Sequence, residues 1–345
     1  KLAASIFHGI DGAKLWFVGM HKGAERVPEA YDRDFAAHMK FYGALREVVQ
    51  GSVPVGVRIP VSLPADLHPT RPNGAGAYAR HAWAQGCFSL YGIPFYADAS
   101  RAPGGVFFLE GAETVARLSD DELDEAFKGR VFADGAAAKE LHRRGFAARL
   151  GCRPSAEYLA YNIEIVRGTG ARPPITKAAS VPPLLDVDPS AEVCSELRFS
   201  PTGESDPSPA FVSAGSVLFA SPGGGHAFTS SFSVPNGFCD LNLLRKAWLK
   251  DALRKLDPGF PLLSANDEPN MVFARRTRDG GTLAITLNMG YDDIAEVRYE
   301  TPRDMSAAET LQPGGTWKPA RAVLRDGVWT LPVALAPFGL VVTRW

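Results

Sequence analysis

Residues 104–111 read GGVFFLEG, and residues 118–151 read LSDDELDEAFKGRVFADGAAAKELHRRGFAARLG. Within the first stretch, Gly105–Leu109 is an apolar run that predicts a buried strand. In the second, Ser119 and Glu122 have the spacing of a capping box, which predicts that a helix begins there and runs to Gly129. A further strand, Val131–Ala133, and a further helix over 136–150 follow. Strands that alternate with helices are typical of a parallel-sheet domain.

The same alternation extends in both directions, over residues 51–257. Val53–Val61 and Pro94–Ala97 predict strands, and Ala77–Tyr91 and Leu241–Leu256 predict helices. Between them, residues 152–210 are rich in Pro and Ser and show no clear period. We therefore expect one α/β domain over 51–257 that carries a β-rich insertion with long loops at about 152–210.

The two flanks have different patterns. Residues 1–50 predict a helix, a strand at Ala13–Gly19 and an amphipathic helix over Tyr31–Gln50. One parallel strand cannot form a sheet alone, so we expect this stretch to be a piece of something longer and to pack against the α/β domain or another chain. Residues 258–345 are short alternating segments separated by turn pairs such as Gly280-Gly281 and Asp326-Gly327, which predict a small antiparallel β-sandwich.

Composition excludes several classes of partner. The chain has 345 residues, which favours two or three domains. Its 37 Lys+Arg balance 38 Asp+Glu, a net charge of −1, which argues against a nucleic-acid partner and against a polybasic membrane anchor. No apolar run approaches the ~20 residues of a membrane span, so we expect a soluble protein, in the cytoplasm or the periplasm.

Cysteine and histidine spacing gives no metal or redox motif. The four cysteines form no C-x-x-C pair and predict buried free thiols rather than a disulfide scaffold: Cys87, Cys152, Cys194 and Cys239. The seven histidines never pair at ligand spacing. We therefore expect no metal and no cofactor.

Several stretches resemble one family of enzymes. Residues 7–17, FHGIDGAKLWF, with the helix to Gln50, resemble the last unit of the TIM barrel of clan-A, family-42-type β-galactosidases. Residues 92–99 (GIPFYADA), the two stretches quoted first and residues 242–256 (NLLRKAWLKDALRKL) resemble the trimerisation domain that follows this barrel, which has the flavodoxin-like fold of class I glutamine amidotransferases. Residues 282–294 (TLAITLNMGYDDI) and 311–320 (LQPGGTWKPA) resemble the C-terminal β-domain.

The resemblance implies a retaining glycoside hydrolase acting on β-linked, galactoside-like sugars. Such enzymes need two carboxyl groups roughly 5–5.5 Å apart, and in this family they end barrel strands four and seven. Since the chain resembles the family only after strand seven, we expect both carboxylates outside it, no catalytic residue within it, and the remainder of the barrel as a partner. The trimerisation domain implies a homo-oligomer, of which a trimer is one form.

Four residues are candidates for binding the carbohydrate substrate. Trp16, Met20, His21 and Lys22 lie at or after the expected barrel strand Ala13–Gly19, at the end where barrel active sites form. Trp16 has a ring that can stack on a sugar, and the other three can line the pocket. The alternative is that Trp16 packs inside the strand layer and that the loop is only solvated.

Other motifs have simpler interpretations. Working glutamine amidotransferases carry a Cys at the turn that corresponds to 109–112 here, and this chain has none, which argues against a divergent amidotransferase-like hydrolase. Gly223–His226 predicts a tight turn rather than a phosphate loop, with His226 a weak site candidate. The acidic residues of 120–125 suit a helix N-terminus, and the Arg and Lys residues of 241–256 predict a solvated face. A non-catalytic oligomerisation or carbohydrate-binding module remains the alternative function.

Overall fold

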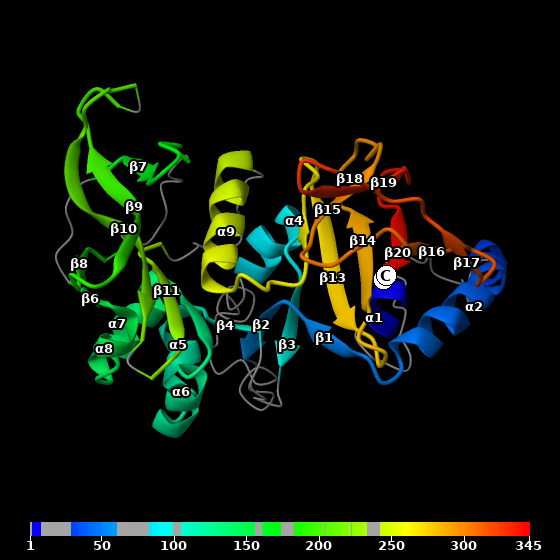
Figure 1. Cartoon of the computed structure of the whole chain (residues 1–345), viewed down its shortest axis with the longest axis horizontal. Helices are drawn as coiled ribbons and strands as arrows, with labels where there is room; N and C mark the ends of the chain where they lie inside the picture. Colours follow the sequence, from blue (N-terminus) through cyan, green and yellow to red (C-terminus); the bar gives the residue numbers. More distant parts are fainter. Residues whose placement is uncertain are drawn as a thin grey trace, which may run out of the picture. The chain divides into compact units, whose positions relative to one another are not determined.

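The computed structural model describes residues 2–7, 29–60, 83–98, 105–155, 161–173, 183–203, 205–221, 223–232 and 242–345. They form two compact units (Figure 1). One unit combines residues 1–55 with 264–345, and the other is the continuous stretch 56–263. The predicted boundaries at 50/51 and 257/258 therefore lie close to the points where the chain passes between units, and residues 1–50 cluster with the C-terminal strands.

The unit 56–263 is built on one mixed sheet. Five parallel strands lie in the order β3-β2-β4-β5-β11: β3 (Phe95–Asp98), β2 (Val57–Pro60), β4 (Val106–Leu109), β5 (Arg130–Ala133) and β11 (His226–Ser230). The sheet continues antiparallel through the insertion: β10 (Ala210–Ala220), β8 (Leu185–Val187) and β6 (Cys152–Pro154), with β9 (Glu192–Phe199) and β7 (Ile163–Val166) paired beside β10. This unit therefore has mixed α/β architecture, with its antiparallel strands between residues 152 and 220.

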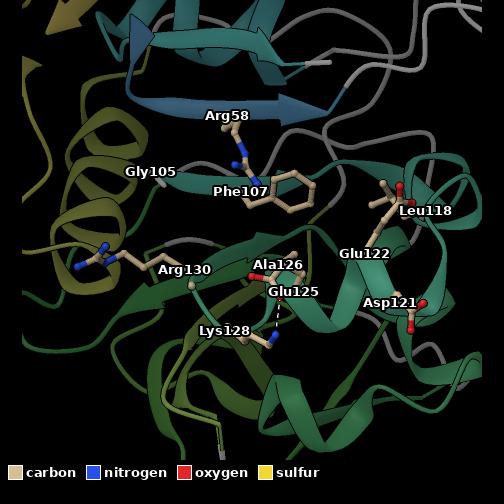
Figure 2. Close-up of a pocket in the computed structure, with 11 residues that line it drawn as sticks. Arg58, Gly105, Phe107, Leu118, Asp121, Glu122, Glu125, Ala126, Lys128 and Arg130 are labelled. Carbon is tan, nitrogen blue, oxygen red and sulfur yellow. Dashed lines mark hydrogen bonds and ion pairs between the residues drawn. The ribbon is translucent and has the colours of Figure 1, made fainter. Parts of the chain in front are cut away.

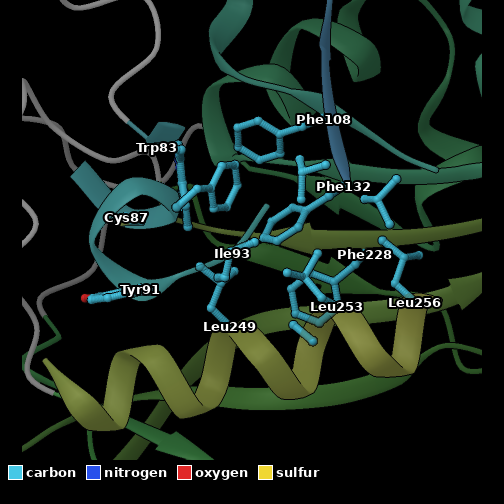
Figure 3. Packing of buried hydrophobic residues seen from close by; sticks show 14 of the residues in the cluster. Trp83, Cys87, Tyr91, Ile93, Phe108, Phe132, Phe228, Leu249, Leu253 and Leu256 are labelled. Atoms are coloured by element: carbon cyan, nitrogen blue, oxygen red, sulfur yellow. The ribbon is translucent and has the colours of Figure 1, made fainter. Parts of the chain in front are cut away.

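Two apolar layers cover the two faces of this sheet because side chains alternate along each strand. Phe108, Phe132 and Phe228 pack under η1 (Trp83–Phe88), α4 (Ser89–Tyr91) and α9 (Leu243–Leu256), as Figure 3 shows. Phe107 and Leu109 point to the other layer, which contains α5 (Gly111–Ala116), α6 (Asp120–Ala126), α7 (Gly135–Arg143) and α8 (Ala147–Leu150).

The local signals are confirmed. Ser119 accepts from the backbone N–H of Glu122, and the Glu122 carboxylate accepts from the N–H of Ser119, so the capping box is complete. Gly151 follows α8 in the left-handed region, with φ +64°. The helix expected over 136–150 is instead two helices, since Gly145 at φ +89° breaks it between α7 and α8.

The other unit contains two antiparallel sheets. The larger has the order β1-β13-β14-β20-β16-β17: β1 (Val53–Val55), β13 (Asn270–Arg276), β14 (Thr282–Asn288), β20 (Leu340–Arg344), β16 (Glu309–Leu311) and β17 (Trp317–Pro319). The smaller is β12 (Leu263–Ser264), β15 (Val297–Glu300), β19 (Val328–Leu331) and β18 (Val323–Arg325). A hydrogen bond between the hydroxyls of Tyr299 and Thr286 joins the sheets.

Helices α1 (Leu2–Phe7) and α2 (Glu29–Val49) belong to the same unit as these sheets. Arg275 of β13 donates to the carbonyl of Phe7, 2.8 Å away, and to both the hydroxyl and the carbonyl of Ser52. The described part of residues 1–50 thus belongs to the same unit as the C-terminal strands, and Arg275 joins it to β13.

The single strand predicted over Val53–Val61 is wrong. Gly56 has φ +127°, a conformation that side chains other than glycine rarely adopt, and a Cβ there would lie 2.2 Å from the carbonyl oxygen of Pro94. At this glycine the chain leaves β1, which pairs with β13, and enters β2 of the α/β sheet. The apolar run therefore supplies strands to two different sheets.

Candidate functional site

The predicted substrate-binding residues Trp16, Met20, His21 and Lys22 lie outside the described residues, so they stay predictions. The weak candidate His226 is exposed and begins β11. Before it, the N–H of Ser221 donates to the carbonyl of Gly225 across 2.7 Å, and Gly224 has φ +87°. A strand follows directly, so the glycine run is the tight turn that the sequence predicts.

The acidic cluster at 120–125 is also structural. Asp120 pairs with Arg144, Asp124 lies 3.1 Å from Arg149, and Glu125 pairs with Lys128. Within the part of the chain that the structure describes, no group of three or more His, Cys, Asp or Glu side chains is arranged to hold a metal ion. No helix in that part has the length and apolar character needed to cross a bilayer.

Two sequence predictions are corrected here. Cys87 is disulfide-bonded, whereas Cys152 and Cys194 are free and buried; the remaining cysteine, Cys239, lies outside the described residues. Spacing in sequence failed because a disulfide depends on proximity in space, which the fold decides.

The basic face of α9 is not solvated as predicted. Lys246 and Lys250 are buried, and an Arg245 nitrogen lies 2.6 Å from a carboxylate oxygen of Glu164 on β7. At Arg245, a carboxylate of the insertion thus takes the place that water was expected to fill.

Two carboxyl groups lie at the carboxyl ends of adjacent parallel strands. Glu110 follows β4 and accepts from the N–H of Trp83 at 3.1 Å. Asp134 follows β5 and accepts from the N–H groups of Ala137 (2.8 Å) and Gly111 (3.0 Å). Burial raises the pKa of Asp134 to about 6 despite these bonds. Asp134 thus caps α7 and holds the turn into α5, which is a structural role.

The turn from β4 into α5 is sharp, because Gly111 has φ +74°. This is the place where the amidotransferase resemblance would require a cysteine, and Glu110 stands there.

A pocket of about 290 Å³ lies beside α6 (Figure 2). The floor of the pocket is formed by Arg58 on β2 and Phe107 on β4, which are register partners on adjacent strands. Its lining is contributed by the strand starts, the end of α5–α6 and the following turn: Arg58, Gly105, Phe107, Leu118, Asp121, Glu122, Glu125, Ala126, Lys128, Gly129 and Arg130. We call it the Arg58 pocket.

Arg58 is an unusual residue for this position. Its neighbours Val57 and Ile59 belong to the apolar layer on the opposite face, so alternation sends Arg58 to the pocket side. Its guanidinium carbon lies 4.5 Å from the centre of the Phe107 ring, and its Nε lies 3.4 Å from Asp98 Oδ2. The residue is only 5% exposed, and its Nη1 is buried without a hydrogen-bond partner among the described residues.

The other charged groups around the pocket are largely compensated. Lys128 is paired with Glu125, and Arg130 Nε lies 3.2 Å from an oxygen of Asp257. The carboxylate of Glu122 is engaged in the capping box. Burial raises the pKa of Tyr96, the register partner of Arg58 on β3, while the charge of Arg58 lowers it.

Sequence reasoning missed this site. The available signal was one arginine in the middle of an otherwise apolar strand, within VPVGVRIPV at 53–61. A buried arginine needs partners, so such a position indicates either an ion pair or a ligand.

The pocket lies near the amino ends of β4 and β5, whereas open α/β sheets hold their substrates at the carboxyl ends. The Arg58 pocket also has no pair of carboxyl groups free of other bonds beside a nucleophile or base. Its geometry therefore supports binding and not a chemical step.

Comparison with known proteins shows the fold only. No family model and no curated protein matches the chain. Among solved structures, it is similar to Gan42B, a GH42 β-galactosidase, with 12% identity and a TM-score of 0.53 over 94% of this chain and 45% of that one. A catalytic mutant of Gan42B from G. stearothermophilus gives 13% identity and 0.52, over 96% and 47%.

A second enzyme, α-L-fucosidase isoenzyme 2 from Paenibacillus thiaminolyticus, has 11% identity and a TM-score of 0.57 over 100% of this chain and 57% of that one. The chain thus spans about half the length of these structures. Its mixed α/β architecture with antiparallel sheets is that of a glycoside-hydrolase-like fold.

Proposed function

We propose that this chain is part of a retaining glycoside hydrolase that acts on β-linked, galactoside-like sugars, and that its catalytic carboxylates belong to sequence outside it. The observation that carries the proposal is the similarity of 94–100% of the chain to roughly half of two different glycosidases. A fold kept over the whole chain, but over half of each enzyme, suits a non-catalytic portion of such an enzyme.

Under this proposal, the units have the roles that the family resemblance implies. The parallel strands of unit 56–263, counted in chain order, run 2-1-3-4-5, which is the order of flavodoxin-like sheets. This supports an amidotransferase-like domain used for assembly. Residues 1–50 would be the last unit of a TIM barrel that other sequence completes, and 258–345 the C-terminal β-sandwich.

The proposal is tested by mass and by activity. Denaturing and native masses of the purified protein show whether a longer polypeptide, a companion chain or an oligomer is present. We expect the 345-residue chain to leave a panel of aryl β-glycosides intact and the form that contains a complete barrel to hydrolyse the β-galactoside. Hydrolysis by the chain alone, at a rate proportional to its concentration, would contradict the proposal.

A substitution tests the predicted sugar contact. In the form with a complete barrel, Trp16→Ala should raise KM several-fold while the thermal midpoint stays unchanged, because a stacking ring contributes to binding and not to the core. Unchanged KM and kcat would show that Trp16 does not contact substrate.

A non-catalytic carbohydrate-binding module is the second candidate. The Arg58 pocket favours it, since it offers a small buried site without catalytic groups. The two candidates differ in one measurable property, which is whether any form of the protein hydrolyses a glycoside.

A further inference from the structure

We infer that the Arg58 pocket binds one neutral sugar ring. The choice of sugar as the ligand class rests on the proposed function. The existence of a ligand rests on the pocket itself, which is formed entirely by residues of the unit 56–263.

The first argument is the unsatisfied guanidinium. Arg58 has five N–H donors, and Asp98 faces only its Nε, at 3.4 Å. Nη1 is buried without a partner among the described residues, and Figure 2 shows the side chain directed from β2 toward Phe107 at the floor of the pocket. A buried N–H donor without a hydrogen bond costs folding free energy. A ligand oxygen that accepts a hydrogen bond from Nη1 would therefore be favoured beside it.

The second argument excludes charged ligands. An anion would share Arg58 with the buried carboxylate of Asp98, and the rim balances Asp121, Glu122 and Glu125 against Lys128 and Arg130 rather than offering it a free cation. A cation would meet the guanidinium itself. A neutral polyol avoids both repulsions, because its hydroxyls accept from Arg58 at the inner end and donate to the rim carboxylates at the outer end.

The third argument is shape. A volume of about 290 Å³ lies at the lower end of the range for small-molecule sites, roughly 300–1,000 Å³, and suits a single ring better than a chain of sugars. Apolar atoms of Phe107, Leu118 and Ala126 line the space between the polar ends. A pyranose has this same pattern, with an apolar C–H face between hydroxyl edges.

Isothermal titration with methyl β-D-galactopyranoside, methyl β-D-glucopyranoside and methyl α-L-fucopyranoside tests the inference on the 345-residue chain. We expect at least one to bind with a millimolar Kd and glucuronate to bind more weakly. Absence of binding by all three sugars, or tighter binding of glucuronate, would overturn the neutral-sugar assignment.

Two matched variants locate the site. Ala126→Phe on α6 fills the pocket from a helical position that is already partly exposed, and should weaken binding at least about tenfold. Ala116→Phe on α5 is an exposed control outside the lining and should leave binding unchanged. Equal affinity in both variants would place the sugar elsewhere on the chain and refute the pocket.

Arg58→Lys examines the guanidinium while it keeps the charge that compensates Asp98. The variant should bind the sugar several-fold more weakly, since one ammonium replaces a planar fork of donors. If no sugar binds in these titrations but the form with a complete barrel hydrolyses a β-galactoside, the sugar-binding inference is wrong and the proposed function stands.

Discussion

Glu164 is the buried charge whose loss should destabilise the chain most. It is fully buried, its carboxylate lies 2.6 Å from Arg245, and Ser195 donates to it at 2.6 Å. Glu164→Gln should lower the free energy of unfolding by about 3–5 kcal/mol, because it removes the charged partner of Arg245 from a fully buried position. Urea unfolding monitored by circular dichroism measures the change.

The matched control is Glu192→Gln. Glu192 is exposed and pairs with Lys255 of the same helix α9 at 2.9 Å. Exposed pairs contribute about 0–1 kcal/mol, so this variant should unfold close to wild type. Equal losses in the two variants would mean that the Glu164 pair is not desolvated as the structure shows.

Asp134 should make stability depend on pH in an unusual direction. Its folded pKa is raised to about 6 from 3.8, mainly by burial. Between these two pKa values the folded state binds more protons than the unfolded state. The contribution of Asp134 to the free energy of unfolding is therefore fully present below pH 3.8 and is lost as the pH rises through 6. The loss is on the order of 3 kcal/mol.

Asp134→Asn removes the ionisation and keeps an N-cap side chain. Relative to this variant, wild type should therefore lose stability between pH 4 and pH 7, as followed by urea midpoints at each pH. A constant difference across that window would show that Asp134 does not titrate there.

Among the elements, those specified by neighbouring residues were predictable. The capping box at Ser119 needs only a residue three positions away, and Leu45 and Val49, four positions apart, are both buried on α2. The same helical period also assigned Met39 to the apolar face, and Met39 is exposed. The hairpins of the C-terminal strands likewise follow from their turn pairs. The residues that form each of these signals lie close together in the chain, within about one helical turn or one hairpin. They can therefore be recognised in a single sequence.

Features that depend on distant segments were not predictable. Lys246 and Lys250 are buried although the local pattern of the helix indicates a solvated face, and the strand at Val53–Val61 is divided because β13 and β4 lie in different sheets. Arg58 belongs to this class too, since its pocket exists only where α6 meets β2 and β4. The candidate residues of 16–22 lie outside the described residues and remain predictions.

Gly56, where β1 gives way to β2, gives a direct test at the element scale. Gly56→Ala combines a φ of +127° with a contact of 2.2 Å to a backbone oxygen. Gly327→Ala is the control, since φ is +78° and no atom lies within 4 Å of its Cβ position. The control should cost about 1 kcal/mol, and Gly56→Ala at least about 2 kcal/mol more, by chemical denaturation. Similar midpoints for both would contradict the close approach at Pro94.

At the scale of the whole molecule, the cysteines report the fold. Burial raises the pKa values of Cys152 and Cys194 to about 12, so both thiols should react slowly in the native chain at pH 8. After denaturation, Cys87 should resist a thiol reagent without reductant and react with it once reductant is added, whereas Cys152 and Cys194 should react in both cases. Four thiols without reductant would contradict the disulfide at Cys87.

The pairing of β1 with β13 has a consequence for how the chain is made. Val53 pairs with Arg276, and the whole stretch 56–263 separates them in sequence. At the usual ~5–20 residues per second, the ribosome needs roughly ten to forty seconds to synthesise that stretch. During this time the intervening unit has all its own strands, while residues 1–55 wait without the sheet they complete. Residues 1–55 are made before the unit 56–263 but complete their sheet only after it, so they are the segment that chaperones would have to protect.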